Sequence, residues 1–308
     1  MKLVFMGTPQ FAVPVLQRLL EDGHEVAAVY TQPDKPVGRG LRFAPPPVKQ
    51  LALEKGLPVR QPVKLRDGTV AAELRAIAPD LCIVVAYGRI LPPAILEAPS
   101  LGCVNLHASL LPKYRGAAPI QWSVLRGETV TGVTSMFMAE GLDTGDIILQ
   151  LETPIGPDET APALSERLSA LGAECVSRTL RLFEAGQVTR VPQEEASATL
   201  APILRKEMGE MDFRRPAGEL HNQVRGLAGW PAAYACFGGK RLKVHESRLW
   251  EKSGKPGEVL EAGGHLVVAC GEGALELCLV QPEGKQRMSG GAFMNGYRLK
   301  PQDSFMER

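Results

Sequence analysis

Two polar side chains with catalytic potential, Asn105 and His107, lie two residues apart in an apolar stretch of the chain. Their neighbours Val104, Leu106 and Ala108 are apolar, and this alternation is typical of a β-strand, in which successive side chains point to opposite faces. The amide and the imidazole therefore project from one face, about 7 Å apart along the strand. An amide can donate to an oxyanion, and an imidazole can donate, accept or carry charge near neutral pH.

A carboxylate that could complete this set is Asp143, in the glycine-flanked turn GLDTGDI at 141–147. It follows another predicted strand, so it could reach the same sheet edge and orient the imidazole. Strand-end histidines are more often structural than catalytic, and Asp in a glycine-rich turn is usually a turn former. The chain has no GxSxG motif and no cysteine beside His107 to serve as a nucleophile. Residue types alone thus predict an α/β enzyme with acid–base chemistry and an unassigned substrate.

Alternating strands and helices must position these residues. Apolar runs predict strands over 2–7, 24–31, 80–88, 102–109 and 131–140. Helical spacing predicts helices over 11–20, 48–56, 67–79 (with Asp67 as N-cap), 118–128 and 159–186. This order predicts a doubly wound α/β domain, in which ligands bind outside the carboxyl ends of the strands. The Asn105 and His107 pair lies at such an end.

The helical periodicity stops after Gly186, and the chain changes character. Residues 189–207 are interpreted as a linker, and 215–229 as one short helix. Short apolar segments separated by Gly and Pro follow at 232–237, 240–247, 257–262, 265–270 and 274–280. Their spacing predicts a small all-β barrel. We therefore expect a catalytic domain over 1–188 and a second domain over 208–308.

Composition describes an ordinary globular chain of 308 residues with a net charge of +1 and 44% hydrophobic residues. Such a charge predicts no partner by itself. The six cysteines form no CxxC pair, and no histidine has metal-ligand spacing, so we expect reduced thiols and no metal. The first apolar run is too short for a signal peptide, and no stretch reaches membrane-spanning length. A cytoplasmic protein without membrane contact is expected.

These motifs together resemble the folate-dependent formyltransferases. The Asn-x-His strand, the turn SLLP at 109–112, Thr134 and the GLDTGDI turn match that family. So do GTPQFAVPVL at 7–16 and AYGRILP at 86–92, and the resemblance covers nearly the whole chain. It implies a formyltransferase-type α/β domain followed by a small open β-barrel resembling an OB-fold. It also implies Asn105, His107 and Asp143 as catalytic residues, and a folate site formed by Tyr87, Gly88, Ile90, Leu91, Ser109, Leu110, Leu111 and Pro112.

The resemblance further implies a reaction without a protein nucleophile or a metal. The donor is 10-formyltetrahydrofolate, and the acceptor is the α-amino group of methionine on initiator tRNA. The amine attacks the formyl carbon, an oxyanion forms, and N10 of the folate leaves. Asn105 and His107 would stabilise the oxyanion, His107 would relay protons, and Asp143 would orient and charge His107.

Cationic residues in two places favour tRNA as the acceptor. The loop 31–50 carries Lys35, Arg39, Arg42 and Lys49, of which the resemblance places Arg39 and Arg42 at the acceptor stem. Lys206 lies in the family's inter-domain segment, and the second domain has basic residues within 240–248 that suit a phosphate backbone. A scattered set of cations is otherwise a solvated surface. One enzyme wrapping one tRNA predicts a monomer.

Other functions fit the same catalytic residues. Formyltransferases of amino-sugar nucleotides share the Asn, His and Asp set, and the cationic loop argues against that class. A glycinamide ribonucleotide formyltransferase would leave the last hundred or so residues unexplained. A hydrolase that releases formate, and a tRNA-binding protein without activity, are the remaining alternatives.

Overall fold

The computed structural model describes residues 1–37, 42–260 and 263–306, without the side chains of residues 37 and 42. The chain divides into two compact units. The sheet unit comprises residues 1–116, 131–153 and 165–200, and the barrel unit comprises 117–130, 154–164 and 201–308. Each unit is described by itself below.

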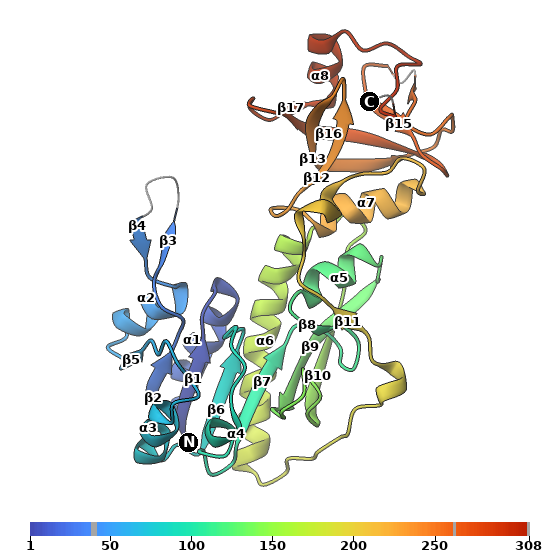
Figure 1. The fold of residues 1–308 in the computed structure, drawn as a ribbon. Helices are drawn as coiled ribbons and strands as arrows, with labels where there is room; N and C mark the ends of the chain where they lie inside the picture. Colours follow the sequence, from blue (N-terminus) through green and yellow to red (C-terminus); the bar gives the residue numbers. More distant parts are fainter. Residues whose placement is uncertain (38–41, 261–262, 307–308) are drawn as a thin grey trace. The chain divides into compact units, whose positions relative to one another are not determined.

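The sheet unit is built on seven strands in the order β10-β9-β7-β6-β1-β2-β5 (Figure 1). The strands are β1 (Lys2–Gly7), β2 (Glu25–Tyr30), β5 (Val59–Arg60), β6 (Leu81–Val85), β7 (Cys103–His107), β9 (Val130–Phe137) and β10 (Ile147–Pro154). β1 pairs in parallel with β2 and β6, and β6 pairs in parallel with β7. β9 runs antiparallel to β7, so the sheet is mixed at this side. The predicted doubly wound fold is confirmed.

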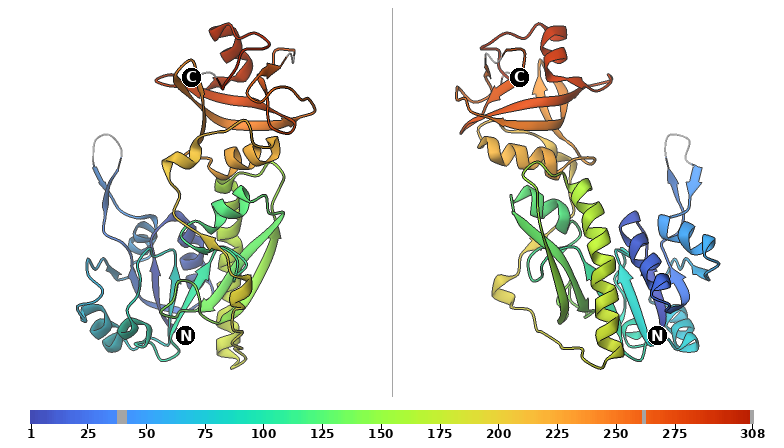
Figure 2. Two further views of the ribbon diagram at one scale, coloured as in Figure 1. Left: turned by 45° about the vertical axis from the view of Figure 1, so that its right-hand side comes forward. Right: turned by 180° about the vertical axis from the view of Figure 1, so that it is seen from behind.

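Helices cover both faces of this sheet (Figures 1 and 2). They are α1 (Val13–Glu21), α2 (Pro47–Glu54), α3 (Thr69–Ile77), α4 (Pro93–Leu96) and α6 (Ala161–Glu184). Leu74 of α3 and Ile95 of α4 pack with Cys82 and Val84 of β6 in one apolar cluster. On the other face, Gly172 of α6 lies so close to Leu106 that a Cβ there would be 2.5 Å from its side chain. Apolar residues on alternate strand positions thus bury both faces.

Several elements differ from the sequence prediction. Strand β10 was not predicted, because apolar and polar residues alternate clearly only over 149–152. The short strands β3 (Lys35–Val37) and β4 (Arg42–Ala44), which pair antiparallel, were not predicted either. Asp67 as N-cap is wrong: helix α3 begins after Gly68, and the Asp67 carboxylate instead accepts a hydrogen bond from the Thr69 N–H at 3.1 Å. A single Asp before Gly therefore forms a turn here and not a cap.

The barrel unit is a curled antiparallel sheet in the order β12-β13-β16-β15-β14, with β17 paired to β16. Its strands are β12 (Ala233–Phe237), β13 (Lys240–Trp250), β14 (Val259–Leu260), β15 (Val267–Ala269), β16 (Ala274–Pro282) and β17 (Met288–Ser289). β12 and β14 stand at opposite ends of this order, which confirms the predicted open barrel. Phe213, Leu220, Leu277 and Phe293 belong to its apolar core.

The helices that lie wholly within the described part of the barrel unit are α5 (Pro119–Leu125), α7 (Ala217–Gly226) and α8 (Gly290–Tyr297). α5 packs against α7 where Gly226 has no side chain, since a Cβ there would lie 2.8 Å from Leu125. α8 was not predicted, because its glycines weaken helix propensity. It begins after Ser289, whose hydroxyl accepts a hydrogen bond from the Ala292 N–H at 3.2 Å.

The remaining short elements are β8 (Arg115–Gly116), β11 (Leu200–Ala201) and 3-10 turns at Gln10–Ala12, Glu195–Ser197 and Lys206–Gly209. No helix among the described residues is long and apolar enough to cross a membrane.

Candidate active site

Asn105 and His107 project from the end of β7 on the sheet face that carries α4. Cys103, two residues before Asn105, is buried on that face, and its thiol donates to the carbonyl oxygen of Ile95 in α4 at 3.8 Å. The side chain of Leu106 points to the opposite face, toward α6. The predicted alternation therefore places the amide and the imidazole on one side.

His107 is buried, and acceptors lie near both ring nitrogens. Its Nε2 lies 2.9 Å from the carbonyl oxygen of Tyr114. Because a carbonyl only accepts, Nε2 carries the hydrogen in this contact. Its Nδ1 lies 3.6 Å from Oδ2 of Asp143, just beyond hydrogen-bond range. The structure thus brings together the histidine and the carboxylate that the sequence pattern paired.

Asp143 reaches His107 from an unusual backbone conformation. Its φ of 51° lies in the left-handed region, which Asp tolerates better than most residues. Its carboxylate accepts a hydrogen bond from the Gly116 N–H at 2.9 Å. Two residues later, Gly145 passes so close to the Phe137 carbonyl oxygen that a Cβ would collide with it. The glycines around Asp143 are therefore required by the tight turn.

The Asn105 amide is available for a ligand. Asn105 is half-buried, and within the residues that the structure describes its side chain has no hydrogen-bond partner in the protein. Its N–H donors lie on the same face as the His107 ring. An amide that is free to donate, on the same face as a fixed imidazole, can stabilise a negative charge that develops during a reaction.

The turn that follows β7 is held by Thr134 of β9, the cross-strand neighbour of His107. The Thr134 hydroxyl donates to the Ser109 carbonyl oxygen at 2.7 Å and accepts from the Leu111 N–H at 3.2 Å. It also accepts from Nε2 of Gln150 at 2.9 Å, and Gln150 donates to the Leu111 carbonyl oxygen at 2.9 Å. The hydrogen bonds of Thr134 and Gln150 thus hold the backbone of the turn after β7, in which the peptide bond between Leu111 and Pro112 is cis.

The expected folate residues differ in how they are exposed. Tyr87 and Leu91 are buried in the apolar cluster under α3 and α4, and Leu111 and Ser109 are buried beyond β7. The Ser109 hydroxyl donates to the Lys113 carbonyl oxygen at 2.7 Å, so it stabilises the turn. Ile90, by contrast, is 77% exposed. Gly88 is exposed, and Leu110 and Pro112 are half-buried, so their backbone groups are the more accessible to a ligand.

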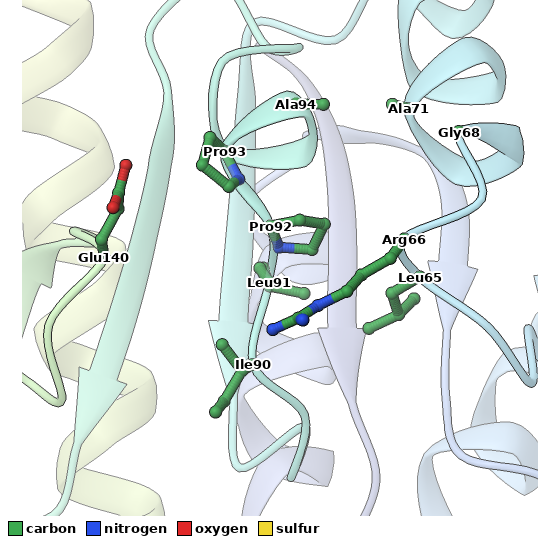
Figure 3. A pocket seen from close by; sticks show the side chains of 10 residues that line it. All are labelled: Leu65, Arg66, Gly68, Ala71, Ile90, Leu91, Pro92, Pro93, Ala94 and Glu140. Carbon is green, nitrogen blue, oxygen red and sulfur yellow. The ribbon is translucent and has the colours of Figure 1, made fainter.

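An open pocket of about 440 Å³ lies where Ile90 and Leu91 meet residues 65–71 (Figure 3). Figure 3 shows the Arg66 side chain extending beside Leu91, with Glu140 at the opposite side. Asn105, His107 and Asp143 are not among the residues that line this pocket.

The cations of the 31–50 loop have different environments. The ammonium of Lys49 is already paired within the protein, since it contacts Asp34 and Gln61, each at 2.8 Å. Asp34 also accepts a hydrogen bond from Nε2 of Gln61 at 2.7 Å, and the hydrogen bonds from Lys49 and then from Gln61 lower the pKa of the Asp34 carboxyl. Lys35 is exposed, Arg39 lies outside the described residues, and only the backbone of Arg42 is described, at the start of β4.

The basic residues of the barrel unit are largely at its surface. Lys206 is exposed in a 3-10 turn, and Lys240 and Lys243 are exposed on β13. Arg241 stacks over the Tyr234 ring at 4.6 Å from its centre. These positions are compatible with an anionic partner.

Two glutamines near the site were not singled out from the sequence. Gln150 lies on the strand that was not predicted, and Gln193 lies in the segment interpreted as a linker. Gln193 donates to the backbone of the Asp143 turn and accepts from Arg115. A glutamine in a polar segment gives no sequence signal of a role in a site. The arginine between Pro112 and Pro119, Arg115, is buried in the structure, which is unusual for this residue type.

Comparison with known proteins identifies relatives over almost the full chain. A family model described as formyl transferase matches residues 1–180, and one described as formyl transferase, C-terminal domain, matches 203–298. A methionyl-tRNA formyltransferase of Acidobacterium capsulatum is 53% identical over 98% of both chains. One of Geobacter sulfurreducens is 48% identical over 98% of this chain and 95% of the relative. The resemblance to the formyltransferases is confirmed.

Solved structures share the fold at much lower identity. WlaRD, a sugar 3N-formyl transferase, has a TM-score of 0.69 at 18% identity, over 93% of this chain and 99% of WlaRD. HypX from Aquifex aeolicus, solved in complex with tetrahydrofolic acid, has a TM-score of 0.66 at 20% identity. That match covers 98% of this chain and 48% of HypX. These similarities concern the fold.

Proposed function

This chain belongs to the formyl transferase family, and from that premise we propose that it formylates the α-amino group of methionyl initiator tRNA. The formyl donor is 10-formyltetrahydrofolate. One observation carries the choice of acceptor: relatives named methionyl-tRNA formyltransferase are 48% to 53% identical over nearly the full length. A sugar formyltransferase of the same fold is only 18% identical.

The proposed chemistry is an acyl transfer in which the substrate supplies the nucleophile. The neutral amine nitrogen of methionine attacks the formyl carbon, and the carbonyl electron pair moves to oxygen. The bond between the formyl carbon and N10 of the folate then breaks, the amine loses a proton, and N10 gains one. The protein has to stabilise the oxyanion and move protons, and Asn105, His107 and Asp143 have suitable groups for this.

Asn105 stabilises the oxyanion in this proposal. Its amide N–H donors are not engaged by the described part of the protein, and they lie on the same sheet face as His107. Donors that are already in place when charge develops cost no reorganisation, and each is worth about 10²- to 10³-fold in kcat.

His107 and Asp143 act as a pair. The Tyr114 carbonyl fixes the ring orientation through Nε2, which leaves Nδ1 facing Asp143 at 3.6 Å. In this proposal Nδ1 takes up the proton that the attacking amine loses and then passes it to N10 of the folate. While Nδ1 is protonated, Asp143 balances the positive charge of the ring, and a shift of about half an ångström would bring the two atoms into hydrogen-bond range.

The remaining assignments follow the same premise. The folate lies along the backbone of 87–91 and 109–112, and the tRNA contacts Arg39, Arg42 and Lys206. We assign catalysis to residues 1–188, linkage to 189–207 and tRNA binding to 208–308. The protein acts as a monomer in the cytoplasm, where translation begins.

The test is a formyl-transfer assay with 10-formyltetrahydrofolate and three acceptors in parallel. These are methionyl initiator tRNA, UDP-4-amino-4-deoxy-arabinose and glycinamide ribonucleotide, and formate release is measured with no acceptor. We expect transfer to the tRNA alone. Transfer to the sugar nucleotide alone would refute the proposed acceptor, and release of formate without any acceptor would show a hydrolase.

A further inference from the structure

We propose that Gln193, oriented by Arg115, is a positioning residue that holds Asp143 in its place beside His107. This inference rests on the proposed function, in which Asp143 acts on His107. Gln193 belongs to the segment after α6, fifty residues beyond Asp143 in the sequence, yet its side chain ends at the Asp143 turn.

The Gln193 amide bridges two carbonyl groups of this turn. Its Nε2 donates to the carbonyl oxygen of Asp143 at 2.8 Å and to that of Gly145 at 2.8 Å. One amide nitrogen has two hydrogens, so both donors are used. The residue it holds has a φ of 51°, a conformation that costs free energy and persists only where the surrounding structure enforces it. Gln193 supplies that enforcement.

Arg115 fixes the direction in which the Gln193 amide points. Its Nε donates to Oε1 of Gln193 at 3.0 Å, so the amide cannot rotate without losing this hydrogen bond. The guanidinium is itself held by two hydrogen bonds to the Glu195 carboxylate, at 2.8 Å and 3.0 Å. The Arg115 side chain is buried, whereas that of Glu195 is 73% exposed, so the bidentate pair holds a buried guanidinium from the protein surface.

The neighbours of Arg115 connect this support to both members of the catalytic pair. The Tyr114 carbonyl accepts from His107, and the Gly116 N–H donates to the Asp143 carboxylate. The backbone of Arg115 is pinned by its own N–H, which donates to the Thr199 carbonyl oxygen at 2.8 Å. Tyr114, Arg115 and Gly116 thus contact His107, Gln193 and Asp143, respectively. Gln193 in turn donates to the backbone of Asp143, so these residues form one connected network.

The experiment is a double-mutant cycle between Gln193 and Asp143, measured by steady-state kinetics of formyl transfer. Gln193→Met keeps the length of the side chain and removes its hydrogen bonds. We expect kcat to fall about ten- to 100-fold, with the KM for folate and for tRNA changed less than about threefold. In an Asp143→Asn background, Gln193→Met should cause little further loss, because the two residues act as one unit. Gln187→Met, an exposed glutamine of the same segment, is the matched control.

A readout that needs no substrate accompanies the kinetics. The ring ¹⁵N chemical shifts of His107 should move in Gln193→Met and stay unchanged in Gln187→Met, while circular dichroism confirms that both variants are folded. Equal proportional losses in the wild-type and Asp143→Asn backgrounds, or unchanged His107 shifts, would refute the positioning role. A wild-type protein that does not formylate tRNA would refute the proposed function instead, and the NMR comparison would still decide the role of Gln193.

Discussion

The carboxylate of Asp143 faces the imidazole of His107 and accepts a hydrogen bond from the backbone N–H of Gly116. The distance from Nδ1 of His107 to Oδ2 of Asp143 is 3.6 Å, and the same oxygen accepts from the Gly116 N–H at 2.9 Å. Asp143 therefore has two separate roles that can be tested: it accepts a hydrogen bond that holds the turn, and it places a negative charge beside His107.

Asp143→Asn tests the charge. The amide oxygen of Asn can still accept from Gly116, so the turn should be preserved while the charge beside His107 is lost. We expect kcat for formyl transfer to fall about 100-fold or more, with unchanged thermal unfolding. Asp146→Asn is the control, because Asp146 lies in the same turn and its carboxylate lies 3.6 Å from the exposed guanidinium of Arg190. A similar loss in both variants would show that the turn, and not the charge of Asp143, is what matters.

The sequence predicted this site better than it predicted the support around it. Asn105 and His107 could be placed on one face because a strand alternates strictly, and Asp143 because glycines flank it. Gln193 could not be found, since its contact with Asp143 depends on where the segment after α6 returns. Contacts between segments far apart in the sequence leave no local pattern.

The same reason explains the errors in the fold. The central strands were predicted because both their faces are buried and their sequences are continuously apolar, as in β6. Strand β10 is mostly half-buried and has a mixed pattern of apolar and polar residues. Helix α8 contains glycines and is stabilised by tertiary packing through Phe293. Local propensity is a weak guide where burial of a few side chains decides the structure.

Thr134→Val tests the hydroxyl that ties β9 to the turn at 109–111. The substitution keeps the shape of the side chain and removes its hydrogen bonds to Ser109, Leu111 and Gln150. We expect the free energy of unfolding in urea to fall by about 1–3 kcal/mol, because buried polar groups lose their partner. The KM for 10-formyltetrahydrofolate should rise as the turn loses its support. Thr134→Ser, which retains the hydroxyl, should keep most of the wild-type stability and a KM close to that of the wild type. If the Ser and Val variants behave alike, the hydroxyl does not hold the turn.

The pH dependence of stability can be tested at Asp22, which joins α1 to α6. Its carboxylate accepts from Nε of Arg18 at 2.7 Å and from the Ser177 hydroxyl at 2.6 Å. Burial raises the pKa of Asp22, but the hydrogen bonds from Ser177 and Arg18 outweigh it and leave the pKa below the ordinary 3.8. A lowered folded pKa means that the ionised group stabilises the fold above the ordinary pKa, and that this contribution is lost as the pH falls.

Asp22→Asn should therefore destabilise the protein at pH 7 and lose that effect in acid. We expect the difference in unfolding free energy between variant and wild type to begin to shrink as the pH falls below the ordinary pKa of 3.8, where Asp22 takes up a proton in the unfolded chain first. The difference should be lost as the pH passes through the lower pKa of the folded state. Urea unfolding at pH 7, 5 and 3.5 measures it, with Glu54→Gln on the exposed side of α2 as the control. A difference that stays constant across this range would show that the charge of Asp22 is not the stabilising feature.

Arg42→Ala tests whether the 31–50 loop recognises the acceptor stem of the tRNA. Lys49 is held by Asp34 and Gln61, and of the other cations of the loop we assign the phosphate or base contact to the arginines. We expect kcat/KM to fall at least about tenfold on methionyl initiator tRNA and less than about twofold on a methionine ester, which has the same amine and no stem. If Arg42 contacts a phosphate, the slope of log affinity against log salt should also become shallower by about 0.7–0.9.

The control for Arg42→Ala is Lys55→Ala, which removes an exposed cation just after α2 and should leave both kcat/KM and the salt slope unchanged. Equal losses on the two acceptors would place the role of Arg42 in the fold or the chemistry and not in tRNA recognition.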